Sequence, residues 1–600
     1  MENTVIKERI VKLRDAMKQH GIDYYLITTA DYHCSEYVSD FFKCREYFCG
    51  FTGSNGNLLV SQKDAGLWTD GRYFVQAEKE LEGTGVTLFR MGDEGVPTIA
   101  EFLQKELQEG MVLGFDGRCV DTSYGLILEK ALKKKKIRFD YLADLSSGIW
   151  TDRPQMPSHP LWLLDEAKCG RSVEEKLELI REKMKEQEAS YLVLSKLDDL
   201  MWLLNIRGGD VECNPVAMSY GVIGLDSMLF FVQESEVTDE ARAFLTQKKV
   251  TIKPYEEMTD FIRDCDWKGQ RVMIDPENIS YLLMKQISAK TETVHAENPT
   301  EWYKAVKTEA ELAQIRDVYA EDSAAVCKFI YWVKQNIGNI PMSELSAQEK
   351  MDSLRREISD YVDLSFTTIS AYGPNAAMMH YEATPESYSE LKPEGFLLVD
   401  SGGQYLRGTT DVTRTIALGK ISDEMKLHYS KTAAGMLQLA AGKFLYGCGG
   451  RNVDILAREP LWELGIDYKC GTGHGIGYIL NVHEGPHNIR WKAGAHNPDA
   501  VLEAGMIVSD EPGVYIAGSH GIRIENILEV RKDVHNGDGQ FMSFGMLTYA
   551  PLEREALDKQ YLTEKDIERI NAYHAATYEK VKKYLNAEEA AWLYEVTRPL

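Results

Sequence analysis

Five short, glycine-rich strings in the C-terminal third of this 600-residue chain constrain its fold most, because each places a metal-binding type of side chain at a strand end or hairpin. One such aspartate alone is more often a turn residue. The interpretation therefore rests on the whole set. The strings LLVDSGG, TTDVTRT, GTGHGIG, SDEPGVY and GIRIENI carry Asp400, Asp411, His474, Glu511 and Glu525, respectively.

If these residues converge, they predict a centre with two divalent metal ions. Four carboxylates balance two divalent cations, whereas a single ion would leave negative charge uncompensated in a pocket. Hard ions such as Mn²⁺ prefer an oxygen-rich ligand set, although Co²⁺ or Zn²⁺ would also bind it. Two neighbouring metal ions usually activate one bridging water for hydrolysis. The set therefore favours a hydrolase.

Local sequence patterns favour convergence. The segments LLVD and TTDVTRTI flank a glycine-rich polar stretch, which predicts a hairpin that brings Asp400 and Asp411 onto neighbouring strands. In GIRIENI, side chains alternate between the two faces of a strand, so Arg523 and Glu525 share a charged face opposite the isoleucines. GTGHGIG has too many glycines for a helix and predicts a tight loop presenting His474. Its glycine spacing does not fit a dinucleotide-binding fingerprint.

These strings resemble those of the pita-bread metallopeptidases, the superfamily of methionine aminopeptidase, prolidase and creatinase. The chain is most similar to the long, three-domain Xaa-Pro aminopeptidase (aminopeptidase P) family, and the similarity covers essentially its whole length. It is carried by MMHYEATP, VDSGGQYLRGTTDVTRT, GTGHGIGYILNVHEGP, DEPGVY and GIRIEN, and upstream by GFTGSNGNLLVS, LWTDGRYFVQA, IWTDRP and LNIRGGDVECNPV. The resemblance implies an α/β (α+β) fold with two creatinase-type domains, a pita-bread catalytic domain and a helical C-terminal extension.

Segment patterns predict where these parts lie. The proline-rich IWTDRPQMPSHP predicts a linker, and EASYLVLSKLDDLMWLL repeats the plan of GIDYYLITTADYHCSEYV, which indicates two related α/β domains. A long amphipathic helix opens the third part, and charged helices form the tail. We therefore expect domains at 1–157 and 158–305, a catalytic domain at 306–545 and an extension at 546–600.

The resemblance also implies roles for individual residues. Asp400 would bind one metal ion, Asp411 and Glu525 would bridge both, and His474 would complete the set. Glu511 would act as general base and proton shuttle as well as ligand.

Further residues are assigned to the substrate by the same resemblance. His380 and His483 would stabilise the oxygen anion that develops during amide hydrolysis. Tyr515 and Arg523 would line a hydrophobic slot for the proline ring. Arg72, which lies in the N-terminal domain, would reach the substrate that is bound in the partner subunit. The alternative for Arg72 is a turn arginine paired with Asp70.

The chain departs from the family pattern at two positions. Cys470 stands where the family more often has a histidine that shapes the proline pocket. His520 stands where an apolar residue is commoner, which predicts a surface or rim histidine. His487 and His496 receive no role.

Composition excludes some functions. The formal net charge is −25 with a pI near 5.1, which disfavours nucleic-acid partners. The ten scattered cysteines form no CxxC pair, so free thiols in a reducing compartment are expected. The N-terminal segment predicts a charged amphipathic helix rather than a signal peptide, and no stretch is apolar enough to span a membrane. We expect a cytoplasmic protein.

Together these observations predict a dinuclear-metal aminopeptidase that removes an N-terminal residue preceding proline, from peptides with proline in second position, as a homodimer. Two alternatives remain open. One is a prolidase restricted to Xaa-Pro dipeptides, and the other is a metal-free, peptide-binding member of the superfamily. The presence of all five ligand residues disfavours the second.

Overall fold

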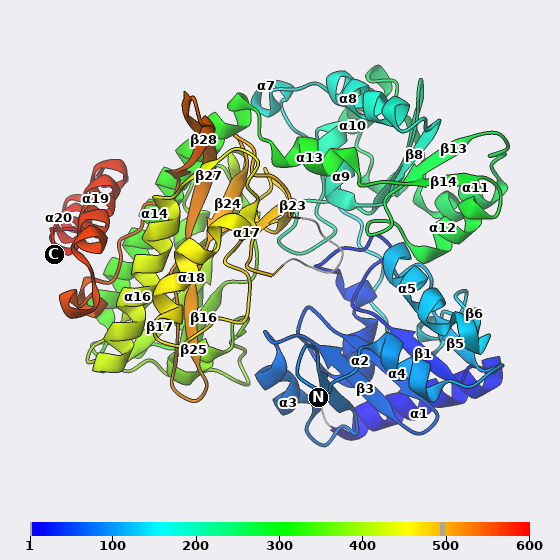
Figure 1. Cartoon of the computed structure of the whole chain (residues 1–600), viewed down its shortest axis with the longest axis horizontal. Helices are drawn as coiled ribbons and strands as arrows, with labels where there is room; N and C mark the ends of the chain where they lie inside the picture. The colour runs from blue at the N-terminus through cyan, green and yellow to red at the C-terminus, as the bar shows by residue number, and fades with distance from the viewer. Residues whose placement is uncertain (1–2, 493–498) are drawn as a thin grey trace. The chain divides into compact units, whose positions relative to one another are not determined.

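Two six-stranded sheets with the same strand order dominate the first half of the computed structural model, which describes residues 3–492 and 499–600 (Figure 1). Contacts divide the chain into two units, one of Met1–Glu166 with Arg171–Glu301 and one of Ala167–Gly170 with Trp302–Leu600. The first sheet has the order β4-β3-β2-β1-β5-β6. Its strands are β1 (Tyr24–Ile27), β2 (Asn57–Ser61), β3 (Ala65–Thr69), β4 (Thr87–Arg90), β5 (Val112–Phe115) and β6 (Arg138–Asp140).

The second sheet, ordered β12-β11-β10-β8-β13-β14, repeats the first strand by strand. In both sheets the third and fourth strands pair antiparallel while the fourth and fifth pair parallel. The predicted internal repeat is thereby confirmed. The strands are β8 (Tyr191–Leu194), β10 (Ser219–Gly224), β11 (Met228–Val232), β12 (Thr251–Pro254), β13 (Arg271–Ile274) and β14 (Glu292–His295), and the short β7 (Trp162–Leu163) pairs with β9 (Ile206–Arg207).

Amphipathic helices cover these sheets. In α1 (Asn3–His20), Ile10, Leu13 and Met17 recur at helical spacing and join the core formed with Tyr25 of β1 and Leu58 of β2. The other helices of this half are α2 (Cys44–Cys49), α3 (Phe74–Leu81), α4 (Ile99–Glu106), α5 (Thr122–Leu132), α6 (Ser146–Ile149), α7 (Glu166–Cys169), α8 (Val173–Glu186), α9 (Leu197–Leu204), α10 (Asp239–Gln247), α11 (Met258–Asp264), α12 (Tyr281–Ser288) and α13 (Pro299–Ala305).

The long helix α14 (Glu309–Asn336) of the second unit forms as predicted. Its start is fixed by a capping box, in which the Thr308 side chain accepts from the Glu311 N–H and the Glu311 carboxylate accepts from the Thr308 N–H. The further helices are α15 (Glu344–Arg356), α16 (Asp423–Ala440), α17 (Gly450–Val453), α18 (Ile455–Trp462), α19 (Glu564–Val581) and α20 (Ala587–Val596). The last two form the predicted helical tail, with α19 against α14 and α16 and α20 against α14 (Figure 1).

Sheets of two, three and six strands carry the glycine-rich strings. One has the order β16-β17-β20, one β15-β18-β19 and one β21-β28-β27-β24-β22-β23, and β25 pairs with β26. The strands are β15 (Tyr361–Leu364), β16 (Ile369–Tyr372), β17 (Phe396–Ser401), β18 (Gly403–Tyr405), β19 (Gly408–Thr409), β20 (Val412–Ala417), β21 (Lys443–Leu445), β22 (Gly473–Gly475), β23 (Glu484–Ile489), β24 (Ile507–Asp510), β25 (Gly513–Ile516), β26 (His520–Arg523), β27 (Asn526–Asn536) and β28 (Gly539–Met546).

The predicted pairing around Asp400 is confirmed. Strands β17 and β20 run antiparallel with Asp400 opposite Thr413, and Asp411 precedes β20 by one residue. The connection between them is not an open loop, because it forms β18 and β19, which pair with each other. Across the described residues, no helix combines the length and apolar character needed to cross a membrane.

A buried ion pair ties α14 and α15 to this hairpin. The Arg355 Nε lies 2.8 Å from Asp322 Oδ1, and Nη2 donates to the carbonyl of Ser401 at 3.1 Å. The hydroxyl of Tyr405 also donates to Asp322, at 2.6 Å. Arg355→Ala should lower the unfolding free energy of the second unit by about 3–5 kcal/mol, because it leaves the buried carboxylate of Asp322 without its cationic partner. Calorimetric melting of that unit measures the effect.

The adjacent Arg356 provides the matched control. It pairs with Glu349 at 2.8 Å on the surface, where both side chains are exposed. Arg356→Ala should change the stability by about 0–1 kcal/mol, as exposed pairs do. Equal melting shifts for the two variants would contradict the assigned role of Arg355.

Candidate metal centre

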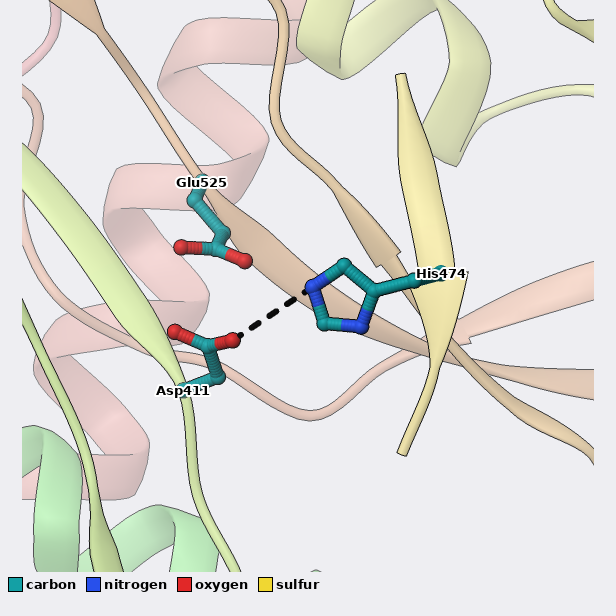
Figure 2. A group of neighbouring side chains, drawn as sticks. All are labelled: Asp411, His474 and Glu525. Carbon is teal, nitrogen blue, oxygen red and sulfur yellow. Dashed lines mark ion pairs between the residues drawn. The ribbon is translucent and has the colours of Figure 1, made fainter. Parts of the chain in front are cut away.

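Asp411, His474 and Glu525 meet in the second unit, with their side chains pointing toward one another (Figure 2). One potential ligand atom from each lies within 4.8 Å of the other two. Asp411 comes from the residue before β20, His474 from β22, and Glu525 from the junction of β26 and β27. Both carboxylates are buried, at 4% and 1% exposure.

The other two predicted ligands lie beside this group. Glu511 Oε1 is 3.4 Å from His474 Nε2, which is itself 3.6 Å from Asp411 Oδ2. Asp400 lies on β17, and its Oδ2 accepts from Arg523 Nη2 at 2.5 Å. The structure therefore brings together all five residues that the sequence singles out.

The prediction of a loop around His474 was wrong. His474 lies in the short strand β22, which pairs with β23 and β24. The glycines serve close strand approach instead: a Cβ at Gly473 would lie 1.9 Å from the Ser509 carbonyl oxygen, and one at Gly475 would lie 2.2 Å from that of Glu484. Both distances are far inside van der Waals contact, so larger residues could not pair here.

The donor chemistry of the site fits divalent cations. One oxygen each of Asp400, Asp411 and Glu525 is buried without a hydrogen-bond partner among the described residues. Burial, followed by neighbouring carboxylates, raises the pKa of Asp411 and of Glu525 well above the usual range. Burial also raises the pKa of Glu511 to about 7. Unpartnered, mutually repelling oxygens of this kind are what a cation would satisfy.

Arg523 and Tyr515 form the wall next to these acids. The Arg523 Nη1 donates to the Tyr515 hydroxyl at 2.9 Å, while its Nε donates to Thr413 Oγ1 at 3.2 Å. The Thr413 hydroxyl in turn donates to Glu525 Oε2 at 2.8 Å. A single buried guanidinium thus links Asp400, the wall and, through Thr413, the carboxylate of Glu525.

The two predicted oxyanion histidines occupy different surroundings. The His483 ring packs edge-on against His474, with ring centroids 4.3 Å apart. His380 is half-buried in a turn that follows the short 3₁₀ helix Gly373–Ala377. That helix lies tight against β26, since a Cβ at Gly521 would lie 1.7 Å from the Ala376 carbonyl oxygen.

Arg72 lies in the first unit, in the turn after β3. Its Nε and Nη2 bind the two oxygens of Asp70 at 2.9 and 2.8 Å. This is the geometry of the alternative that the sequence left open, a turn arginine paired with its neighbour. Its contact with substrate stays a prediction.

The prediction of an exposed His520 was wrong. His520 is fully buried under α16, and its Nε2 lies 3.0 Å from Nδ1 of His428. Its Nδ1 also lies 2.8 Å from the Ser519 hydroxyl oxygen. Burial lowers the pKa of both histidines. A neutral pair in which one ring donates to the other explains how two imidazoles can be buried side by side.

His487 and Cys470 have different surroundings. Burial lowers the pKa of His487 to about 4, and its Nε2 lies 2.7 Å from the Ile507 carbonyl oxygen. Cys470 packs at the edge of a cluster that includes Tyr468 and Tyr515. His496 lies outside the described residues.

Sequence reasoning missed two buried groups at the site. Burial and the neighbouring acids raise the pKa of Asp510 well above its usual range. Its position directly before Glu511 in the sequence was the available signal that it lies at the site. Lys307 forms a fully buried ion pair with Glu484, the neighbour of His483. These two lie 177 residues apart, so no local pattern could reveal the pair.

Comparison with known families assigns each part of the chain. The Creatinase/Prolidase N-terminal domain matches residues 9–153 and, in a second form, residues 152–311. Metallopeptidase family M24 matches residues 284–532, and the C-terminal region of peptidase M24 matches residues 540–600.

Full-length relatives agree with these matches. Xaa-Pro aminopeptidase 1 of Dictyostelium discoideum is 36% identical over 100% of this chain and 97% of its own length. Aminopeptidase P2 of Arabidopsis thaliana is 34% identical over 99% and 89%, respectively. The solved X-prolyl aminopeptidase of Caenorhabditis elegans, described as a cytosolic enzyme with a di-nuclear active site, is 33% identical with a TM-score of 0.94 over 99% of this chain and 100% of that one. The chain thus belongs to metallopeptidase family M24, among its full-length Xaa-Pro aminopeptidases with two creatinase/prolidase N-terminal domains.

Proposed function

We propose that this chain hydrolyses the bond between an N-terminal residue and a following proline, with two divalent metal ions at its centre. The observation that carries the proposal is the cluster of buried carboxylates around His474, with oxygens that lack hydrogen-bond partners among the described residues. The similarity to full-length Xaa-Pro aminopeptidases supports the choice of substrate.

The five clustered residues are proposed as the ligands, with Asp411 and Glu525 bridging two ions. Mn²⁺ is proposed for the oxygen-rich set, with Co²⁺ and Zn²⁺ as alternatives. When bound, such ions would polarise the peptide carbonyl and lower the pKa of a water molecule. The ligand set is Asp400, Asp411, His474, Glu511 and Glu525.

The protein's own groups would then handle protons and charge. Glu511 is proposed to take a proton during attack and return it to the leaving nitrogen, and its raised pKa supports this exchange near neutral pH. His380 and His483 are proposed to donate N–H groups to the developing oxygen anion. Tyr515 and Arg523 are proposed to line the slot for the proline ring.

Prolidase activity on Xaa-Pro dipeptides is the closest alternative. The chain carries two N-terminal domains and a C-terminal region in addition to its catalytic segment. These additions support an enzyme for longer peptides, with domain boundaries proposed near residues 157, 305 and 545. Arg72 is proposed to contact substrate from the first of these domains.

A cytoplasmic location is also proposed. It is supported by the cytosolic C. elegans relative and by ten cysteines that all lack disulfides. Fractionation of the source cells that placed the protein in an oxidising compartment would contradict it.

Metal content separates ligands from catalytic residues. Asp411→Ala or Glu525→Ala should lose both ions, because each proposed bridge holds the pair. His380→Ala and His483→Ala should keep both ions but lose turnover by roughly 10²–10³-fold, the usual effect of removing one oxyanion donor. Elemental analysis of the purified variants and their kcat values provide the measurement.

Either half of this prediction can fail separately. A fully active Asp411→Ala variant with one retained ion would reject the bridging role. An unchanged kcat in a metal-loaded histidine variant would show that the histidine has no catalytic part.

Peptide length separates aminopeptidase from prolidase. Xaa-Pro-Xaa peptides should be cleaved with kcat/KM at least equal to that of Xaa-Pro dipeptides, while alanine in place of proline should give much poorer substrates. Arg72→Ala should impair longer peptides more than dipeptides, without loss of metal. The measurement is a kcat/KM series over dipeptide, tripeptide and pentapeptide.

Arg118 offers a matched control for Arg72, since it occupies the same Asp-Gly-Arg turn and binds Asp116 through the same two nitrogens. Arg118→Ala should leave the length preference unchanged. Strict dipeptide preference in the wild-type protein would favour prolidase.

A homodimer is proposed, supported by an exposed aromatic pair on the second unit. Trp462 and Trp491 are 40% and 41% exposed and pack edge to face with ring centroids 5.8 Å apart. Large aromatic groups exposed together mark protein contacts. Trp462→Glu should therefore shift a dimer to monomer in analytical ultracentrifugation, whereas Val534→Glu, at an even more exposed site on β27, should not. A wild-type monomer at micromolar concentration would exclude the homodimer.

A further inference from the structure

Arg414 connects the candidate metal centre to the C-terminal helices. It lies on β20, three residues after Asp411, and is 2% exposed. Its nitrogens donate to the carbonyl oxygens of Thr413, Glu525, Ala550 and Pro551, to the amide oxygen of Asn526 and to the hydroxyl of Tyr573, at 2.6–3.2 Å. These acceptors are all neutral, and together they occupy all three nitrogens of the guanidinium.

Tyr573 brings α19 into this network. Its hydroxyl accepts from Arg414 Nη2 at 2.8 Å, donates to the Ala550 carbonyl at 2.7 Å and lies 3.2 Å from Asn526 Oδ1. The next residue, His574, accepts from the Leu552 N–H at 3.2 Å. The helix therefore holds the segment that follows β28 and, with it, the far side of the guanidinium.

The same network fixes the backbone of Glu525. Its N–H donates to the Thr413 carbonyl at 3.1 Å, and its carbonyl accepts from Arg414 Nη1 at 2.6 Å. Its carboxylate accepts from the Thr413 hydroxyl at 2.8 Å. Glu525 lies in the gap between β26 and β27, where strand pairing alone does not set its direction. Arg414 supplies the missing restraint on one of its two peptide groups.

We propose that the C-terminal extension is part of the metal-binding apparatus, with Tyr573 as a positioning residue that holds the backbone of Glu525 through Arg414 and Asn526. This inference rests on the proposed role of Glu525 as a metal ligand. Groups that orient a ligand from behind change metal affinity by roughly 10–100-fold. The extension would thereby tune how tightly the centre binds divalent cations.

A purely structural role for the extension predicts something different. The helix α19 also buries Ile570 in a core cluster with Phe396 and Ile522. If packing were its whole contribution, substitutions in α19 would lower the melting temperature without changing metal affinity. The two roles therefore separate in a titration of metal rather than in a stability measurement.

The test uses the full-length protein, stripped of metal by chelation and titrated with Co²⁺, whose visible absorption reports ligand geometry. Tyr573→Phe removes one oxygen atom and keeps the ring in place. It should weaken Co²⁺ binding by roughly 10-fold or more and alter the absorption spectrum. By linkage, Co²⁺ should also slow hydrogen exchange of α19 in the wild-type protein, and less so in the variant.

Two variants of the same helix serve as controls. Tyr578→Phe removes a hydroxyl from a ring that packs on Tyr594 and that is not among the acceptors of Arg414. Ile570→Val loosens the packing without touching the network. Both should leave Co²⁺ affinity and spectrum unchanged, and the second should lower the melting temperature.

Unchanged Co²⁺ affinity and spectrum in Tyr573→Phe would overturn the inference, and so would an equal loss in Ile570→Val. A wild-type protein that binds no Co²⁺ would overturn both the inference and the proposed centre. A wild-type protein that binds Co²⁺ but cleaves no Xaa-Pro bond would reject the proposed function alone.

Discussion

Electrostatic repulsion among buried carboxylates is the constraint on which the catalytic half of this molecule depends. Asp411, Glu511 and Glu525 share a region from which water is largely excluded. Burial, and after it the charges of the neighbouring carboxylates, raises the free energy of charging Asp411 and Glu525. Folding tolerates such a cluster only where strands, glycines and one guanidinium hold it in place. The antiparallel pairing of β17 with β20, the close approach of β22 to its neighbours and the position of Arg523 all serve that requirement.

This constraint explains where the second unit places the contacts that hold these acids. The acids lie at strand ends, where backbone pairing is weakest, and polar contacts from behind replace it. Thr413 holds the Glu525 carboxylate, Arg414 holds its backbone, and Lys307 holds the segment that carries His483 by binding Glu484. Each support comes from an element distant in sequence. The site is therefore the product of the whole unit rather than of one motif.

Local patterns in the sequence predicted much of this fold and of the residues at the site. Helical spacing of apolar residues predicted α1 and α14, and alternation around Glu525 predicted a charged face toward the site. The glycine-rich strings predicted which residues converge. The burial of His520 and the support behind Glu525 escaped prediction for one physical reason. The burial of His520 depends on His428, 92 residues away, and the contact of Arg414 with Tyr573 spans 159 residues. Contacts of this range leave no periodic trace in the sequence.

The raised pKa values of the acids have a consequence for how the centre would be filled. Burial, followed by the neighbouring carboxylates, raises the pKa of Asp411 and of Glu525 well above the usual range, so before a cation arrives these acids hold protons more readily than exposed ones. The pKa of Glu511 is raised to about 7. A divalent ion competes with protons for these oxygens, because carboxylates bind metal in their deprotonated form. Loading is thus an exchange of hydrogen ions for metal, favoured as the solution becomes more alkaline and opposed as it becomes acidic. Occupancy would then follow the acidity of the surroundings as well as the supply of metal.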